Sequence, residues 1–169
     1  MDREEELRRV WESALRLLVY RERSRKELRD RLAGKKYSAA AISAVIEKLE
    51  RLELLDDEKF ARLWVNSRII FKPRSAWLIG RELREKGIDP EIAGRVLDEM
   101  IPPEVEREAA RQLTESRARH YRGEPSAIVR RKLFAYLARR GFSSDIIREC
   151  VEELIGEEEE GDEEEEEAE

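Results

Sequence analysis

The segment LDDEKFARLWVNSR, residues 55–68, decides how the rest of the chain is interpreted. From Phe60 onward its apolar residues recur at helical spacing and, continued to residue 71, cover most of a helix circumference. Only Lys59, Arg62 and Asn66 are left to face water. A helix that is apolar on most sides is normally covered on two sides, so we expect this one to lie between similar helical neighbours.

An internal repeat supplies those neighbours. A shift of 51 residues sets Ser24 on Ser75, and a further shift of 54 sets Gly87 on Gly141. Each unit has the apolar spacing of three helices, so the sequence predicts an all-α fold of three tandem three-helix repeats, about nine helices, at residues 1–54, 55–101 and 102–156. Because a unit of this size cannot bury enough apolar surface alone, we expect the repeats to stack as an elongated, curved solenoid.

Helix ends are marked by capping residues. Ser24 followed by Glu27 is typical of a capping box at the start of a second helix. Gly87 suits the left-handed position just past a helix end. The first repeat has Lys36 at the equivalent position, which predicts a turn of different geometry that uses Gly34.

Charge is distributed unevenly along the chain. The formal net charge is -6, but residues 157–169 hold eleven carboxylates, and the remaining 156 residues carry 29 acidic against 34 basic side chains. The body is therefore basic, and the acidic tail at residues 157–169 is expected to be disordered because like charges cannot be buried together. The tail either serves solubility alone or folds back on the basic body.

The sequence offers little for catalysis. His120 is the sole histidine, and no Cys/His cluster has metal-ligand spacing. Asp56 and Asp57 are explained as the cap and first turn of a helix, and Cys150 as a small core residue. No run approaches eighteen apolar residues and the N-terminus lacks a signal-peptide pattern, which predicts a cytoplasmic protein. We expect neither an enzyme nor a bound cofactor or metal.

Basic residues recur at equivalent places and are candidate binding contacts. The turn between first and second helices carries Arg21 and Arg23 in the first repeat, Lys72 and Arg74 in the second, and Arg130, Arg131 and Lys132 follow in the third. A second set, Lys35, Lys86 and Arg140, lies at the ends of second helices, where the helix dipole alone favours cations. Arg68 either pairs with a carboxylate such as Glu82 or presents its head to a partner. Trp77 is expected in the core.

The residues in and after the segment 55–68 resemble those of a known protein family. Leu55-Asp56-Asp57, Phe60-Ala61, Trp64-Val65, Arg68, Glu82-Leu83 and Lys86-Gly87-Ile88 resemble the signature of the RecX family over residues 12–155. The resemblance implies a monomeric bacterial regulator in homologous recombination, DNA repair and the SOS response. It would bind the RecA recombinase filament on DNA and restrain its ATPase, strand-exchange and co-protease activities. A repeat stack with a basic edge suits the helical groove of such a filament, where it would bridge successive protomers.

Two other functions stay open from the sequence. Each pair of second and third helices joined by a short turn could form a helix-turn-helix-like DNA-binding module, although no exposed Arg, Asn or Gln set recurs at base-reading spacing. A general helical scaffold for another protein is the third possibility.

Overall fold

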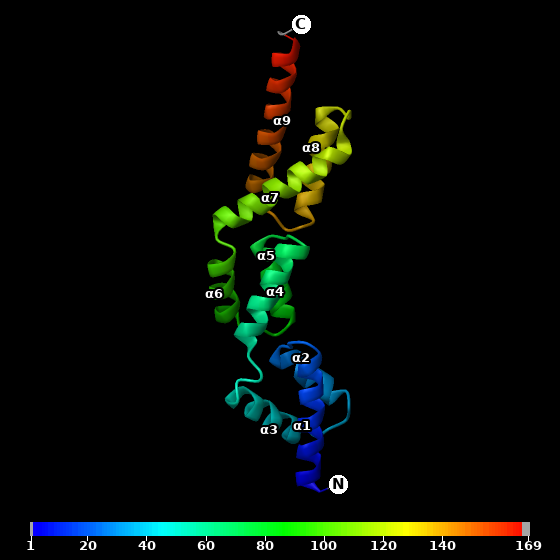
Figure 1. Ribbon diagram of the computed structural model, residues 1–169, viewed down its shortest axis with the longest axis vertical. Helices are drawn as coiled ribbons and strands as arrows, with labels where there is room; N and C mark the ends of the chain where they lie inside the picture. The colour runs from blue at the N-terminus through cyan, green and yellow to red at the C-terminus, as the bar shows by residue number, and fades with distance from the viewer. Residues whose placement is uncertain (1, 167–169) are drawn as a thin grey trace. The chain divides into compact units, whose positions relative to one another are not determined.

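The computed structural model describes residues 2–166, with side chains described as far as Gly156 (Figure 1). The described residues form nine α-helices and one 3-10 helix, with no strand. The first three helices are α1 (Arg3–Tyr20), α2 (Arg25–Ala33) and α3 (Ala39–Arg51). The next three are α4 (Asp57–Phe71), α5 (Ala76–Glu85) and α6 (Pro90–Met100). The last are α7 (Pro103–Ala118), the 3-10 helix η1 (Arg119–Tyr121), α8 (Ser126–Ala138) and α9 (Ser144–Glu166). The all-α prediction of three-helix repeats is confirmed.

Backbone contacts group these helices into two units. One unit holds Met1–Asn66 and Gly80–Met100, and the other holds Ser67–Ile79 and Ile101–Glu169. Helices α4 and α5 each contribute residues to both units, so the division passes through the second repeat. The elongated, curved stacking predicted from the sequence stays a prediction.

The first repeat has its own apolar core. Val10 and Ala14 of α1, Leu28 and Leu32 of α2, and a stripe on α3 are buried together, with Leu7, Trp11 and Tyr37 packed against them. Ser38 caps α3 by accepting a hydrogen bond from the Ala41 amide at 3.2 Å. This core follows the spacing that the sequence predicted for three amphipathic helices.

The start of α4 is buried as predicted, but its end is not. Phe60, Ala61 and Val65 are at most 3% exposed, and Asp56 caps the helix by accepting from the Glu58 and Lys59 amides. Leu63, Ile69, Ile70 and Phe71 are exposed, however, by 47%, 37%, 58% and 77%. The expectation that this helix is covered on two sides is therefore wrong: one side of its first half, at Leu63, and its last turn, from Ile69 to Phe71, stay exposed.

The third repeat buries Ala110 of α7, Leu133 and Leu137 of α8, and Ile147 and Cys150 of α9 in one cluster. Burial raises the pKa of the Cys150 thiol, which keeps it in the neutral form. The sequence-based assignment of Cys150 to the core is confirmed.

The turn after the second helix has a left-handed residue at the same place in all three repeats. Lys36, Gly87 and Gly141 have positive φ angles of 63°, 77° and 84°, and the amide of each donates to a carbonyl three residues earlier at 2.9 Å. Gly34, by contrast, is right-handed with a φ of -60°. The prediction of a different turn at Gly34 is wrong, because the hydrogen-bonding requirement of the helix end forces even a lysine into the left-handed conformation.

Helix α9 continues past Gly156, where the sequence predicted the folded part to end. Its backbone stays helical to Glu166. A helix already nucleated by packed residues gains one hydrogen bond for each residue added, and glutamate has good helix propensity, which together explain the extension. Residues 167–169 of the predicted disordered tail lie outside the described residues.

Candidate interaction surface at the basic turns

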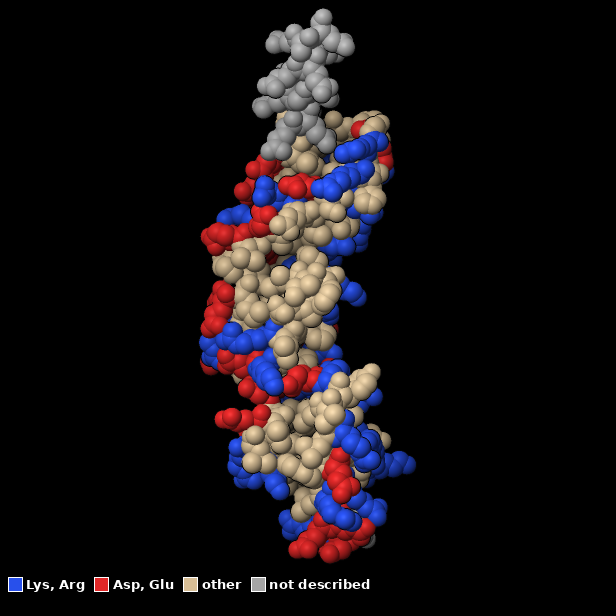
Figure 2. All heavy atoms as spheres, in the orientation of Figure 1, with Lys and Arg blue, Asp and Glu red and all other residues tan. Residues whose placement is uncertain are grey.

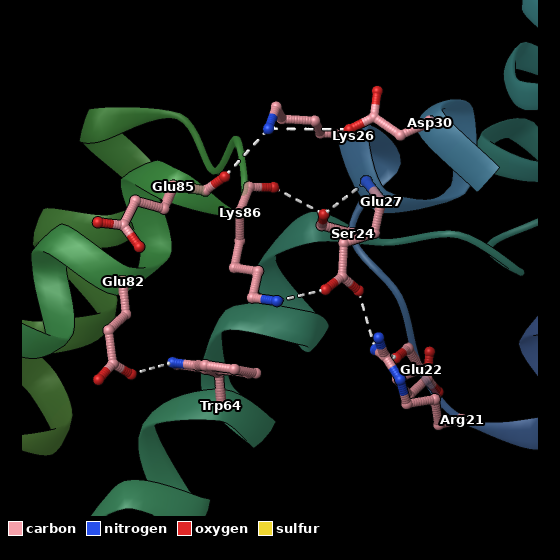
Figure 3. A network of polar contacts seen from close by, with 10 residues as sticks. All are labelled: Arg21, Glu22, Ser24, Lys26, Glu27, Asp30, Trp64, Glu82, Glu85 and Lys86. Atoms are coloured by element: carbon pink, nitrogen blue, oxygen red, sulfur yellow. Dashed lines mark hydrogen bonds and ion pairs between the residues drawn. The ribbon is translucent and has the colours of Figure 1, made fainter. Parts of the chain in front are cut away.

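The turn between α1 and α2 packs on the turn between α5 and α6 within one unit (Figure 3). Ser24 caps α2 by accepting from the Glu27 amide at 3.1 Å, and its hydroxyl donates to the Lys86 carbonyl oxygen at 2.7 Å. Lys26 Nζ also donates to the Glu85 carbonyl at 3.2 Å. A Cβ on Gly87 would lie 2.6 Å from the Lys26 Cβ, so only glycine allows this approach. We call this contact the first joint.

Glu27 brings two predicted cations together at the first joint (Figure 3). One carboxylate oxygen accepts from Arg21 at 2.8 Å and the other from Lys86 Nζ at 2.6 Å. Burial opposes the charge of this carboxylate, but the hydrogen bonds from Arg21 and Lys86 outweigh it and lower the Glu27 pKa. The capping box is therefore only half formed, since the Glu27 side chain joins repeats instead of folding back on its own helix.

Lys86 and Glu82 also position Trp64 of α4. The Lys86 ammonium lies 4.8 Å from the centre of the indole ring, and the indole N–H donates to Glu82 at 2.8 Å (Figure 3). Glu82 is thus engaged by Trp64, and Lys86 fills a structural position at the joint.

Arg23 is buried, in contrast to the exposed contact that the sequence predicted. Its residue exposure is 6%, and its Nε donates to the Leu17 carbonyl at 3.2 Å. Burial, followed by the like charge of Arg21, lowers the Arg23 pKa from its ordinary value. The side chain therefore holds the end of α1 against the turn and is not available to a partner.

The same joint recurs in the other unit, between the α4–α5 turn and the α8–α9 turn. The Ser75 amide donates to the Arg140 carbonyl at 3.0 Å, and Ser75 caps α5 by accepting from the Leu78 amide at 3.1 Å. A Cβ on Gly141 would lie 2.5 Å from Ser75 Oγ. We call this contact the second joint. Its residues are the repeat equivalents of Ser24, Lys86 and Gly87.

The remaining candidates differ in how accessible they are. Lys72 is exposed, while Arg74 and Arg68 are half-buried and both make contacts. Trp77 is 64% exposed, which corrects its expected place in the core: the first turn of α5 carries it on the outer side of the helix.

On α8, Arg130 and Arg131 are exposed. Lys132 instead pairs with Glu124 at 2.5 Å and lies 4.9 Å from the Tyr121 ring centre.

The cations of the second set are engaged within the fold. Lys35 Nζ donates to Ser13 Oγ at 2.6 Å, and the Arg140 guanidinium lies 3.8 Å from the ring centre of Tyr136. On the face shown in Figure 2, blue and red atoms lie side by side around broad tan areas. The accessible part of the predicted set is therefore Lys72, Arg130 and Arg131, with Arg21 exposed but paired.

Sequence reasoning missed the acidic members of these joints. Glu27 was assigned to its own helix, and Glu106, which accepts from the Ala76 amide at 2.8 Å, was not singled out. The repeat alignment of Ser24 with Ser75 and of Gly87 with Gly141 was the available signal, because both joints are built from aligned positions.

The structure limits other kinds of site. Among the described residues, no group of three or more His, Cys, Asp or Glu side chains could hold a metal ion. No helix in that part of the chain is long and apolar enough to span a membrane.

Comparisons with known proteins agree with the repeat structure. Three family models match, described as the first, second and third three-helix domains of RecX, at residues 11–49, 56–97 and 104–151. The regulatory protein RecX of Mycobacterium leprae is 42% identical over 151 residues, covering 89% of this chain and 86% of that protein. The regulatory protein RecX of Chlorobium phaeobacteroides is 36% identical over 148 residues, covering 88% of this chain and 95% of that protein.

A solved structure has the same fold. The crystal structure of RecX from Lactobacillus salivarius superposes with a TM-score of 0.80 at 29% identity, covering 89% of this chain and 97% of that one. The joints, the helix order and these matches lead to one assignment. The chain belongs to the RecX family of regulatory proteins.

Proposed function

We propose that this chain binds the RecA recombinase filament assembled on DNA, along its helical groove, and inhibits its ATPase, strand-exchange and co-protease activities. The observation that carries the proposal is membership of a family of regulatory proteins across all three domains. The chain acts by binding as a monomer in the cytoplasm, without catalysis.

The joints support a mechanism based on several weak contacts. A serine-to-glycine-turn contact links the first repeat to the second and the second repeat to the third. A filament is a row of identical protomers, so equivalent positions on one chain can each engage a protomer. Binding of one repeat then raises the effective concentration of the next, and the assembled filament is preferred over free recombinase.

The cations that make these contacts are Lys72, Arg130 and Arg131. They are exposed, and none of them forms an ion pair with a described side chain that would have to be broken. Arg21 joins this contact set once its hydrogen bond to Glu27 is replaced by a bond to the partner. We leave Arg23 out of the contact set because it is buried.

Replacing these cations tests the proposal. Lys72→Glu and the pair Arg130→Glu/Arg131→Glu should each weaken inhibition of recombinase ATPase on single-stranded DNA by about tenfold. Arg29→Glu, an exposed residue on α2 with the same change of charge as Lys72→Glu, should leave inhibition as in the wild type. Unchanged inhibition in all variants would remove these residues from the interface.

Binding to naked DNA and to recombinase-coated DNA separates the proposal from the DNA-binding alternative. The wild-type chain should prefer recombinase-coated DNA at every salt concentration. Added salt should weaken whatever part of the binding affinity comes from contacts with DNA phosphates. Equal affinity for the two forms would instead support a plain DNA-binding module.

A further inference from the structure

Helices α1 and α3 of the first repeat enclose an open groove. It consists of two adjoining hollows of about 380 and 230 Å³ that share Leu7 and Ala44. The floor of the larger hollow is apolar, made by Leu7, Trp11, Ala44 and Val45. Small alanine side chains on α3 leave room for another element to approach the backbone closely.

The other two repeats close the equivalent groove with ion pairs. The repeats can be aligned at this place by their buried residues, Val10 with Ala61 and Ala110 on the first helices, and Val45 with Val96 and Cys150 on the third helices. At the positions of Leu7 and Ala44, the second repeat has Glu58 and Arg95, paired at 2.6 Å, and the third has Arg107 and Glu149, paired at 3.8 Å.

The other two repeats also carry charged side chains at the positions of Trp11 and Lys48. The second repeat has Arg62 and Glu99 there, paired at 2.7 Å. The third has Arg111 and Glu153, which line a hollow of only about 20 Å³. The first repeat thus has the apolar residues Leu7, Trp11 and Ala44 where the other repeats have charged side chains, and it leaves a space open that they fill.

The rim of the groove is cationic. Arg8, Lys48 and Arg51 line the larger hollow, and among the described side chains none of them forms an ion pair. Lys48 Nζ lies 4.6 Å from the centre of the Trp11 ring, so its charge is held at the groove. An apolar floor between cations matches a helix with bulky apolar residues on one face and carboxylates beside them.

The acidic tail of this chain does not fit that description. Residues 157–169 contain only Gly161 and Ala168 besides acidic residues, so they offer no bulky side chain for the floor. The tail is therefore not the occupant of the groove.

We propose that the α1–α3 groove of the first repeat binds an acidic amphipathic helix of a partner protein. Apolar side chains of that helix enter the larger hollow, and its carboxylates pair with Arg8, Lys48 and Arg51. The site uses residues of the first repeat and none of Lys72, Arg130 and Arg131, so it does not depend on the filament contacts proposed above.

A synthetic peptide tests this proposal. The probe is a fluorescein-labelled helical peptide with Leu and Phe on one face and Glu on both sides, titrated with the full chain and followed by fluorescence anisotropy. We expect saturable binding, weakened about tenfold or more by Lys48→Glu and by Ala44→Glu. Both changes introduce the residue that the third repeat has at the same position, so the fold should tolerate them, as thermal unfolding followed by circular dichroism will show. Arg29→Glu, which carries the same charge change as Lys48→Glu away from the groove, should bind as the wild type does.

Amide shifts in nitrogen-15 NMR spectra locate the peptide. The shifts should gather at Leu7, Trp11, Ala44 and Val45, and residues around Cys150 and Leu154 in the closed groove of the third repeat should not move. Two altered peptides serve as controls, one with Lys in place of every Glu and one with Ser in place of every Leu and Phe. The proposal is overturned if either peptide binds as well as the original one. It is equally overturned if oligo(dT) displaces the peptide from these residues, or if the chain is a dimer that Ala44→Glu makes monomeric.

Discussion

Gly87 offers the sharpest test of the first joint, because the chain contains a matched control. Gly87 and Gly123 have similar left-handed φ angles of 77° and 82°. A Cβ at Gly123 would meet no atom within 4 Å, whereas a Cβ at Gly87 would lie 2.6 Å from Lys26 Cβ and 2.7 Å from Lys26 Cδ. Replacing each glycine by alanine therefore separates backbone strain from loss of the joint.

The magnitudes follow from the two environments. Left-handed alanine costs about 1–2 kcal/mol, offset by about 0.4–1 kcal/mol from the lower entropy of the unfolded chain, so Gly123→Ala should cost about 1 kcal/mol. At Gly87 the Lys26 Cβ is fixed to α2 and cannot rotate away. The turn must move, and overpacking of this kind adds about 1–3 kcal/mol, for a total of about 3 kcal/mol. The hydrogen bond from Ser24 to the Lys86 carbonyl would stretch as a result.

Urea unfolding followed by far-ultraviolet circular dichroism measures the two free energies of unfolding. Gly87→Ala should lower the transition midpoint clearly more than Gly123→Ala at an unchanged slope. Native-state hydrogen exchange should also show faster exchange of the Leu28 amide at the start of α2. Equal destabilisation by the two substitutions would mean that α2 does not approach the α5–α6 turn as closely as the structure shows.

The remaining predictions concern a turn, a carboxylate and a buried hydroxyl. Lys36→Gly should raise the free energy of unfolding by about 0.5–1 kcal/mol in urea titrations, because glycine adopts the left-handed φ of 63° without strain. The folded-state pKa of Glu27 is lowered, so its stabilising contribution is complete above its unfolded pKa of about 4.3 and is lost as pH falls through the lower folded value. As the pH is lowered from neutral to below 4, the melting temperature of the wild type should therefore fall more than that of Glu27→Gln. Parallel curves would contradict the pairing of Glu27 with Arg21 and Lys86. Thr114→Val should change the thermal midpoint little, because the buried hydroxyl donates only to the Ala110 carbonyl of its own helix at 2.8 Å, and loss of stability by several kcal/mol would show that it has another role.

Much of the local structure was predictable from the sequence for a simple reason. Capping at Ser24, Ser38 and Asp56, and burial of Phe60 and Val65, depend on residues within one or two helical turns. These interactions are encoded by spacing, which is visible in the sequence. Lys36 is the exception. Residue type favoured Gly34 as the left-handed residue after α2, but the hydrogen bonds at the helix end placed that conformation at Lys36.

The candidate surface was only partly predictable. The sequence pointed to the turns that hold Arg21, Arg23 and Lys72, but it could not distinguish a buried cation from an exposed one. Arg23 is buried because the end of α1 folds over it, and Arg21 is paired because Glu27 approaches from the next helix. Exposure of a long side chain depends on what the fold brings near it, and no periodicity reports that.

The sequence by itself determined the helices, their caps, the three-fold repetition and the basic character of the turns, since each depends on neighbours along the chain. Only the tertiary structure decided that Glu27 would join Arg21 to Lys86, and that the α1–α3 groove would stay open where Glu58 and Arg95 close its counterpart. Lys86 is 59 residues from Glu27 along the chain, and Arg95 is 37 residues from Glu58. Contacts at such separations are made by the packing of whole helices, which the pattern of any one helix does not contain.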